Sequence, residues 1–551
     1  MKKKMLAVLL SAAMAVTALT GCGNSSDNVS EGTTETDAAG TTEETPGGGI
    51  EESEETAVNE TAEGEPKYGG TLRFGYGNSI ATPGYTPMAT ANAYLYYLTL
   101  AYENLITYDN DGQIIGKLAT EWVIDNDEPS ITWTLREGVE FADGTPFNAE
   151  AVKVNIEEYQ ANNRTETANV KSCEVIDDTH IKMILESVNS STLESVGYFV
   201  FYMSPDVLRN DRASLDTSTC GTGPFQLTEF ENNAYAIYSK NENYWQEGLP
   251  YLDSVSITTV TEETTKSTAF QAGEYDMIDA SSPTILQELD GAGIYLTEKN
   301  ENGMGVGTLG LIPNSAIDSP WADERVRRAL CYAIDVDAIN AAFQLGTAQL
   351  TDQWAAPGAV TYNDDLNHFK YDPERAKELL AEAGYADGFT TNLVTISTLS
   401  DAFTAIANML EEVGIHCEIQ LVDGSTQNQM YMDGTWEGLM PHWTTVSPDL
   451  GLYMGRHLDY DGAYYAKGIQ HPDKEMNLLE EIRTCTDETE RRNLEKELQK
   501  AIYDAEEGSC LFGRPLYISP SIMYKYDYVM NDRAKEAFAS AWDLSGCWLD
   551  K

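Results

Sequence analysis

The chain has 551 residues, which is more than one compact core usually holds, so we expect two or three lobes. Asp and Glu number 89 against 35 Lys and Arg. The resulting net charge of -54 argues against nucleic acid or an anionic membrane surface as a partner, because both repel an acidic protein. Eight cysteines in a chain of this length are too sparse for a small disulfide-rich domain.

The first 22 residues predict export and a lipid anchor. Three lysines at positions 2–4 precede an apolar stretch over residues 5–19 that is too short to span a bilayer comfortably. The stretch ends in Leu19-Thr20-Gly21-Cys22, which resembles the bacterial lipobox, whose cysteine is acylated and becomes the first residue of the mature protein. Residues 1–21 are therefore predicted to be a lipoprotein signal peptide, and lipidated Cys22 would hold the protein on the extracytoplasmic face of the cell membrane. The alternative is ordinary secretion with Cys22 buried.

Residues 22–66 are predicted to be an acidic, disordered tether. Positions 23–66 contain 13 Asp or Glu, 8 Thr and 7 Gly, with no aromatic residue and no Lys or Arg. Such a segment cannot bury enough apolar surface to offset the entropy lost on ordering.

The other seven cysteines show no CxxC spacing, and an odd number outside the membrane leaves at least one thiol free. Cys331 and Cys417 lie on apolar faces and are interpreted as small core residues. The pairing of the others stays open: Cys173, Cys220, Cys485, Cys510 and Cys547.

The amino-terminal half of the folded part alternates mainly as strands. Residues 69–77 form a short strand interrupted by glycine, and residues 94–102 have apolar residues at helical spacing. Residues 131–136 alternate as a half-buried strand should, and a helix that Asn148 can cap follows. Two further runs alternate in the same way, at residues 173–185 and 225–238.

The carboxy-terminal half changes to helix–strand units. Asp372-Pro373-Glu374 is typical of a helix start, and Gly384 ends that helix. A second helix starts at Asp401 and closes at Gly414. The next run, residues 415–421, is predicted to bury Ile415, Cys417, Ile419 and Leu421 on one face. Helices that feed strands repeatedly indicate an α/β lobe with a parallel or mixed sheet.

Seven motifs follow one another between residues 118 and 385. They are Leu118-Ala119-Thr120-Glu121-Trp122, Leu135-Arg136-Glu137-Gly138-Val139 with Phe141-Ala142-Asp143-Gly144-Thr145-Pro146, Gly221-Thr222-Gly223-Pro224-Phe225, Asn243-Tyr244-Trp245, Gln271-Ala272-Gly273-Glu274-Tyr275-Asp276, Asp323-Glu324-Arg325-Val326-Arg327-Arg328-Ala329-Leu330, and residues 371–385. With these motifs the chain resembles the family-5 extracellular solute-binding proteins of ABC importers, a group that includes oligopeptide, dipeptide and nickel receptors. The likeness runs through nearly all of residues 67–551.

The resemblance implies an α/β fold with mixed sheets, a two-lobed clamshell of the type II-like periplasmic-binding-protein kind with a third, inserted subdomain. By analogy, lobe one takes residues 67–112, 215–312 and 510–551, the inserted subdomain residues 113–214, and lobe two residues 313–509. Crossings near 312 and 510 would form a hinge, so a solute in the cleft would stabilise the closed state. The implied function is capture of a solute and delivery to an ABC permease by a monomer without cofactor.

The resemblance also implies where a ligand sits. Pocket walls in this family come from the loop after the first strand, the strand before the first crossing and a Trp-bearing segment of lobe two. Here these segments contain Tyr76, Asn78, Met304, His442 and Trp443. A flat aromatic ring beside short polar side chains suits a peptide backbone or a sugar ring. The alternative for Trp443 is packing at the inner edge of the sheet.

One departure weakens the assignment to peptides with a free amino terminus. Peptide receptors of this family often carry an Asp three residues after that Trp, where this chain has Val446, and the next carboxylate is Asp449. Asp449 is kept as a ligand candidate through a shifted loop, and Trp354 is a second stacking candidate. His442 suggests a nickel or metal–chelate ligand, although the six histidines show no metal-ligand spacing and no metal site is predicted.

Alternatives remain at the level of function. The resemblance implies a binding protein for a peptide or peptide-like solute, not an enzyme. HExxH and GxSxG are also absent, which removes the common metalloprotease and serine-hydrolase signatures. A receptor for short oligosaccharides or a metal–chelate is the alternative within the class. An extracellular glycan-acting enzyme is a further alternative, because two carboxylates among 89 suffice for that chemistry. A signalling receptor that reports on a solute without import is the last.

Overall fold

The computed structural model describes residues 65–89, 94–109, 113–298, 307–445, 449–459, 465–518, 522–534 and 542–551. Within these ranges, none of the helices combines the length and the hydrophobicity that crossing a membrane requires. The predicted signal peptide, Cys22, the tether as far as residue 64, Met304 and Val446 lie outside the described residues. The other seven cysteines are all free thiols.

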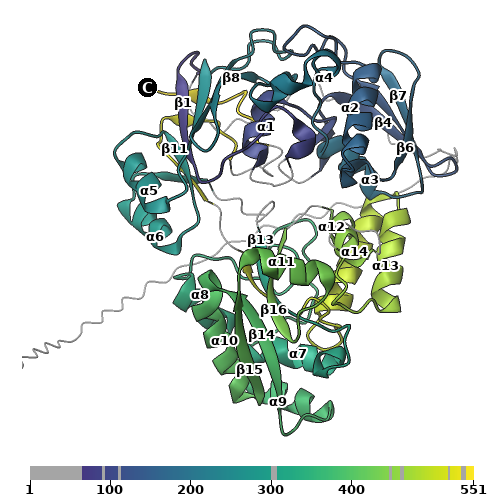
Figure 1. Ribbon diagram of the computed structural model, residues 1–551, viewed down its shortest axis with the longest axis vertical. Coiled ribbons are helices and arrows are strands. Elements are labelled where there is room, and N and C mark those ends of the chain that lie inside the picture. The colour runs from purple at the N-terminus through teal and green to yellow at the C-terminus, as the bar shows by residue number, and fades with distance from the viewer. Residues whose placement is uncertain are drawn as a thin grey trace, which may run out of the picture. The chain divides into compact units, whose positions relative to one another are not determined.

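A seven-stranded mixed sheet organises the first part of the chain (Figure 1). β1 lies inside it, parallel to both β10 and β11, and its inward residues Leu72, Phe74 and Tyr76 are buried. The helices of this part are α1 (Leu95–Ala101), α5 (Glu263–Gln271) and α6 (Pro283–Ala292). In sheet order the strands are β12 (Leu296–Glu298), β18 (Ile522–Lys525), β11 (Met277–Ala280), β1 (Thr71–Tyr76), β10 (Ser254–Thr259), β9 (Tyr235–Lys240) and β8 (Phe225–Glu231).

The inserted subdomain contains a four-stranded antiparallel sheet. Its strands, in sheet order, are β4 (Ala119–Asp125), β5 (Ser130–Leu135), β7 (His180–Leu185) and β6 (Val170–Val175). Its helices are α2 (Ala149–Ala161), α3 (Ser191–Tyr198) and α4 (Pro205–Asn210), and the two-stranded ribbon β2 (Ile106–Tyr108) and β3 (Ile114–Gly116) precedes it. One hydrophobic core runs from Phe74 in the first sheet to Trp133 and Ile156 here, so these two parts pack as one body.

Local sequence signals in this half are confirmed. The side chain of Asn148 caps α2 by accepting a hydrogen bond from the Ala151 N–H at 3.0 Å. The run at residues 173–185 belongs to the hairpin β6–β7, and the run at 225–238 belongs to the hairpin β8–β9. Each alternating run forms strands as predicted, and a turn divides it into two of them.

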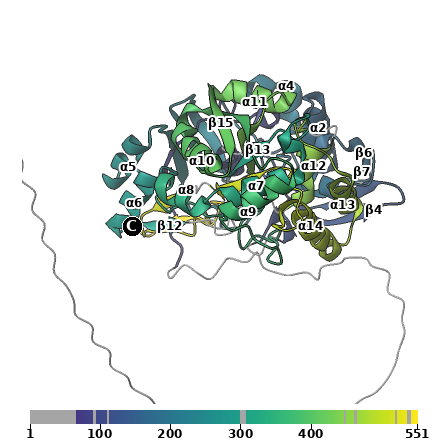
Figure 2. The ribbon, with the colours of Figure 1, turned by 90° about the horizontal axis from the view of Figure 1, so that it is seen from below.

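A second, five-stranded sheet organises the rest of the chain. In sheet order its strands are β15 (Ile415–Val422), β14 (Phe389–Ile396), β16 (Leu439–Thr445), β13 (Gly307–Pro313) and β17 (Arg514–Ile518). Two cores flank it, and Figure 2 shows α7 and α9 on one side of β13 and α11 on the other. One face packs on α7 (Glu324–Ala333), α8 (Val336–Phe343), α9 (Pro373–Glu382) and α10 (Ser400–Glu412). The other face packs on α11 (Gly424–Asp433), α12 (Leu450–Leu458), α13 (Asp473–Thr484) and α14 (Glu488–Tyr503). A separate short ribbon near the carboxyl terminus consists of β19 (Val529–Met530) and β20 (Trp548–Leu549).

The boundaries between the lobes differ from those drawn by analogy. β13 begins at Gly307 and β17 ends at Ile518, and both are strands of the second sheet, whereas residues up to 312 and from 510 onward were assigned to lobe one. The chain therefore passes between the two sheets before β13 and again between β17 and β18. Sheet pairing fixes these positions, and pairing partners far along the chain leave no local signal.

The prediction for residues 415–421 is wrong at its second half. Ile415 is fully buried and Cys417 is half-buried, but Ile419 is 40% and Leu421 is 59% exposed. β15 is the edge strand of its sheet, so a single neighbouring strand covers it from the side. Apolar alternation shows that a strand has one apolar face, and it does not show how far other elements cover that face.

Candidate functional site

Two hydrogen bonds hold the backbone of the loop that follows β1. The Gly77 N–H donates to Asp279 Oδ1 at 2.9 Å, and the Tyr97 hydroxyl donates to the Asn78 carbonyl at 2.7 Å. Tyr76 is 3% exposed, with its ring centroid 5.2 Å from that of Tyr96. The exposed Asn78 side chain is thus presented on a rigid backbone, whereas Tyr76 supports the loop from beneath.

A buried ion pair holds this loop. Lys266 Nζ lies 2.6 Å from Asp279 Oδ1, and the Lys266 side chain is 1% exposed. Burial raises the pKa of Asp279, and the Lys266 ammonium opposes that rise. A Cβ at position 77 would lie 3.0 Å from Asp279 Oδ2 and 3.1 Å from Lys266 Nζ, so a larger residue here would press on the ion pair.

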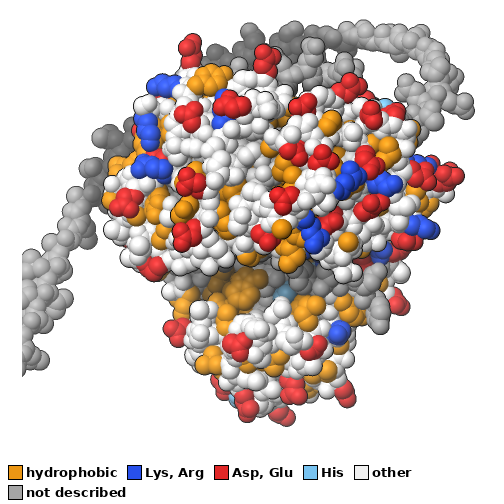
Figure 3. Space-filling view, turned by 45° about the horizontal axis from the view of Figure 1, so that its top comes forward, with side chains coloured by type: hydrophobic (Ala, Val, Ile, Leu, Met, Phe, Trp, Pro, Cys, Tyr) orange, Lys and Arg blue, Asp and Glu red, His pale blue; other side chains and the backbone are white. Residues whose placement is uncertain are grey.

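Trp443 is presented near the end of β16, on the second sheet. It pairs with Leu309 of β13, and its side chain is 41% exposed. A Cβ built on Gly307, which pairs with Thr445, would lie 3.4 Å from Cδ1 of the indole, so Gly307 lies directly beside the ring. Figure 3 shows hydrophobic side chains gathered in a hollow, with Asp and Glu scattered over the face around it.

His442, next to Trp443, belongs to an aromatic cluster. Its ring stacks on Tyr431 with centroids 4.1 Å apart, and the Tyr431 hydroxyl bonds His457 Nδ1 at 2.6 Å. Burial lowers the pKa of His442 to about 3, so the imidazole is neutral. Its Nε2 has no hydrogen-bond partner among the described residues. A neutral imidazole with an unused nitrogen is able to bind either a donor group or a metal.

Trp354 lies in the same cluster but inside the core. It is 4% exposed, and its ring centroid lies 3.9 Å from that of Phe512 and 5.4 Å from that of His457. These contacts account for the indole without a ligand.

Both carboxylate oxygens of Asp449 have structural partners. It caps α12 by accepting from the Leu452 N–H at 2.6 Å, and its other oxygen lies 3.1 Å from Arg491 Nη1. The side chain is fully buried. Sequence reasoning did not find Arg491 as its partner, because the two residues lie on different helices and no local pattern joins them.

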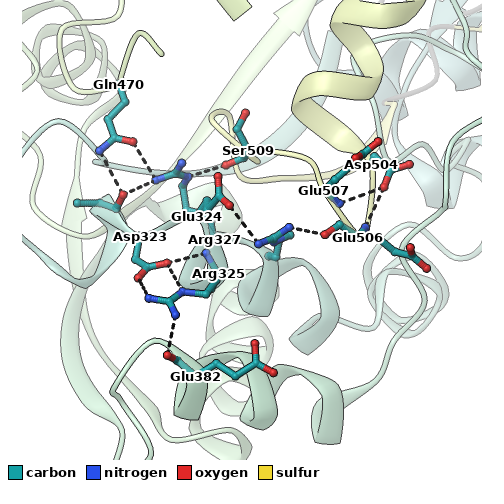
Figure 4. A network of polar contacts seen from close by, with 12 residues as sticks. Asp323, Glu324, Arg325, Arg327, Glu382, Gln470, Asp504, Glu506, Glu507 and Ser509 are labelled. Atoms are coloured by element: carbon teal, nitrogen blue, oxygen red, sulfur yellow. Dashed lines mark hydrogen bonds and ion pairs between the residues drawn. The ribbon is translucent and has the colours of Figure 1, made fainter. Parts of the chain in front are cut away.

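The motif at residues 323–330 also serves the fold (Figure 4). Arg327, which is 2% exposed, donates from Nε to the Ser509 carbonyl at 2.7 Å and from Nη1 to Gln470 Oε1 at 3.2 Å. Asp323 caps α7 and pairs with Arg325. This motif therefore ties α7 to distant loops through contacts that require no ligand.

Within the described part of the chain, no group of three or more His, Cys, Asp or Glu is arranged to hold a metal ion. The structure thus brings His442 and Trp354 together in one cluster and exposes Trp443 and Asn78 on different sheets. The side chains of Tyr76 and Asp449 are buried, so neither is exposed to a ligand. Met304 lies outside the described residues.

Known proteins resemble this chain in sequence. It is 27% identical over 428 residues to the glutathione-binding protein GsiB of Pectobacterium atrosepticum. This match covers 73% of this chain and 80% of its relative. It is 30% identical over 338 residues to GsiB of Salmonella typhi, and this match covers 58% of this chain and 64% of its relative.

Solved structures resemble it in fold. The periplasmic binding protein DppA of Helicobacter pylori in complex with the peptide STSA matches with a TM-score of 0.70 at 23% identity, over 88% of this chain and 99% of that one. NikA of Brucella suis in complex with Fe(III)-EDTA matches with a TM-score of 0.72 at 23% identity, over 86% and 98%. These matches confirm the predicted two-lobed α/β fold of a periplasmic binding protein.

The sequence model of one family spans most of the folded chain. It aligns with residues 113–464, from the inserted subdomain through β16 and α12 of the second sheet. The chain belongs to the bacterial extracellular solute-binding proteins, family 5.

Proposed function

We propose that this chain is the substrate-binding component of an ABC importer that captures a peptide or peptide-like solute and hands it to a membrane permease. Membership of family 5 carries the proposal. Two relatives are named for binding glutathione, which is itself a short peptide, and DppA was solved with the peptide STSA. On this proposal the protein binds and releases its solute and catalyses no reaction.

The site proposed for the solute lies between the two sheets. Trp443 supplies an exposed indole for stacking, and Asn78 supplies an amide that can bond a peptide backbone. Neither contributes a charge. The buried, paired state of Asp449 disfavours the role of an ammonium anchor there, so the proposed ligand is gripped through its backbone and side chains.

A metal–chelate is the second candidate, and one observation favours it. His442 keeps a neutral imidazole whose Nε2 has no partner among the described residues, and NikA was solved with Fe(III)-EDTA. A short oligosaccharide would use the same indole by stacking.

Export and anchoring complete the proposal. A signal peptide over residues 1–21 and acylation of Cys22 would keep the chain, as a monomer, on the extracytoplasmic face of the membrane. The permease would then meet a receptor that is already concentrated at its surface.

Calorimetric titration of the full chain with probes of three chemical classes, namely peptides, an oligosaccharide and a metal–chelate, tests the ligand class. We expect binding of glutathione or of a mixed tripeptide library, and none of maltotriose or of a nickel–histidine complex. Binding of maltotriose or nickel–histidine alone would overturn the peptide assignment and leave the solute-binding assignment standing. Native mass spectrometry of the freshly purified protein provides an independent reading, because a retained ligand adds its own mass.

A further inference from the structure

Five charged side chains meet where the inserted subdomain contacts the helices of the second sheet. In Figure 1, α3 of the subdomain lies directly above α12 and α14. The side chains are at most 14% exposed, and we name them the Glu194 cluster. It consists of Glu194 on α3, Asp449 at the start of α12, and Arg491, Arg492 and Glu495 on α14.

The cluster holds three carboxyl groups and two guanidinium groups. Arg491 lies 3.1 Å from Asp449, 3.5 Å from Glu194 and 3.8 Å from Glu495, and Arg492 lies 3.0 Å from Glu495. With every group ionised, the buried cluster would carry one uncompensated negative charge, which is costly away from water. One bound proton makes it neutral.

Glu194 is the carboxyl group with the least compensation. Glu495 accepts hydrogen bonds from the Leu450 and Gly451 N–H groups at 3.1 and 3.3 Å, and Asp449 accepts one from its own helix start. Glu194 Oε1 has no hydrogen-bond partner among the described residues. The proton therefore belongs on Glu194.

The boundary that the cluster occupies is formed largely by polar contacts. Besides the cluster, it is crossed by hydrogen bonds from the Ser190 N–H to the Arg483 carbonyl at 2.7 Å and from the Ser190 hydroxyl to the Ile482 carbonyl at 2.9 Å. A cavity of about 330 Å³ opens beside it, lined by Ser195 of α3 and Gly455 of α12 among others. The subdomain shares its core with the first sheet, and α12–α14 share theirs with the second.

We infer that this contact opens and closes as the two lobes move, and that closing takes up one proton on Glu194. The inference deepens the proposed function and rests on it, because closing around a solute is the step by which a clamshell retains it. Protons would then favour the closed state in the same way as the solute does.

The electrostatics of the contact agree with its charge count. Burial, and then the charge of Asp449, raise the pKa of Glu194 to about 8, while Arg491, Arg492 and the Tyr108 hydroxyl of β2 lower it. Burial also raises the pKa of Glu495, and Arg492 opposes that rise. From the solvent side, Glu488 lies 3.6 Å from Arg492 and is 46% exposed, so water screens its charge.

The sign of the pH dependence follows from these values. A solvated glutamic acid has a pKa near 4.3. The closed contact binds the proton more tightly than the open one, so closing gains stability as the pH falls below about 8 and loses it as the pH rises through that value. One proton per closing event changes the closing equilibrium by about tenfold per pH unit between those limits.

Hydrogen exchange of the Ser190 amide tests this in the ligand-free full chain, because that N–H donates across the boundary. Mass spectrometry with residue-level fragmentation gives its protection factor, corrected for the intrinsic pH dependence of exchange. From pH 8 to pH 6 we expect this factor to rise by roughly tenfold per pH unit. Glu194→Gln should make it independent of pH. Glu157→Gln, on the exposed side of α2 in the same subdomain, should keep the slope of the unmodified protein.

A constant protection factor in the unmodified protein, or an unchanged slope in Glu194→Gln, would overturn the inference. Infrared spectroscopy detects the proton on the carboxyl group directly. It requires only that the Glu194→Gln variant folds. A protonated carboxyl band is expected at pH 7 in the unmodified protein and its absence in Glu194→Gln. Neither experiment adds a solute, so failure of the peptide assignment would leave both results interpretable.

Discussion

At the scale of single residues, the exposed fraction of the side chain distinguishes the roles of Trp443 and Trp354. Trp443 leaves 41% of its side chain exposed, whereas Trp354 leaves 4% and packs on Phe512. An exposed ring contributes little to folding and offers its face to a ligand, and a buried ring does the opposite.

Trp443→Ala should therefore weaken the binding of whichever probe the titrations identify by about fivefold or more, since removing a stacking aromatic from a binding site commonly costs about 1 kcal/mol or more. The free energy of unfolding without ligand should change by less than about 0.5 kcal/mol. Calorimetry and urea unfolding measure the two quantities. Trp354→Ala is the matched control, with an expected loss of roughly 3–5 kcal/mol of stability. A large stability loss in Trp443→Ala would show that this indole belongs to the core.

The Lys266–Asp279 pair beneath Gly77 gives a second prediction at this scale. Lys266→Met leaves a buried carboxylate without its cation, which should cost roughly 3 kcal/mol of unfolding free energy at pH 7. Without the ammonium, burial raises the pKa of Asp279 further, so acidification to pH 5 should recover part of the loss as the carboxyl group takes a proton. Urea unfolding at both pH values measures this. The double variant Lys266→Met with Asp279→Asn should lose less than Lys266→Met alone, and equal losses at both pH values would contradict the argument.

At the scale of elements, local sequence signals predicted where helices and strands form. They did not predict which faces other elements cover. Asn148 and Asp372 cap their helices as expected, because capping depends on residues three positions apart. β15 was predicted as a strand with one buried face, yet the sheet ends at this strand and Ile419 and Leu421 are exposed. Which strand lies at the edge depends on pairing across the whole sheet, and alternation inside one strand contains no information about it.

Substitutions along β15 should show this gradient directly. Ile415→Ala is expected to cost about 2–5 kcal/mol, since Ile415 is fully buried, whereas Leu421→Thr should change the unfolding free energy by about 0.5 kcal/mol or less. Both are read from urea unfolding midpoints at a constant slope. Comparable losses at the two positions would mean that the end of the strand is covered in solution.

At the scale of the whole molecule, the motifs indicated the family and the two-lobed fold, but not where the chain changes lobe. Residues 323–330 were read as a family signature, and Arg327 shows what the signature does, since it bonds the backbone at Ser509 far along the chain. The placement of β13 and β17 in the second sheet depends on pairing between segments that lie apart in sequence. For the same reason the Glu194 cluster was not predicted, because its members come from α3, α12 and α14 and meet only in the folded chain.

The proposed signal peptide and the proposed acylation of Cys22 give a prediction about where the protein is found. A thioether-linked lipid at Cys22, together with a second acyl chain, would hold the protein at the membrane, because each buried methylene adds about 0.8 kcal/mol of membrane affinity. Cys22→Ala should therefore move the protein from the membrane fraction to the soluble extracytoplasmic fraction, with the probe affinity unchanged. Fractionation followed by immunoblotting measures the first, and calorimetry on the released protein measures the second. Cys173→Ala is the matched control, because it removes a thiol from the folded part and should leave the protein in the membrane fraction. Retention of Cys22→Ala in the membrane fraction would contradict the proposed anchoring through Cys22.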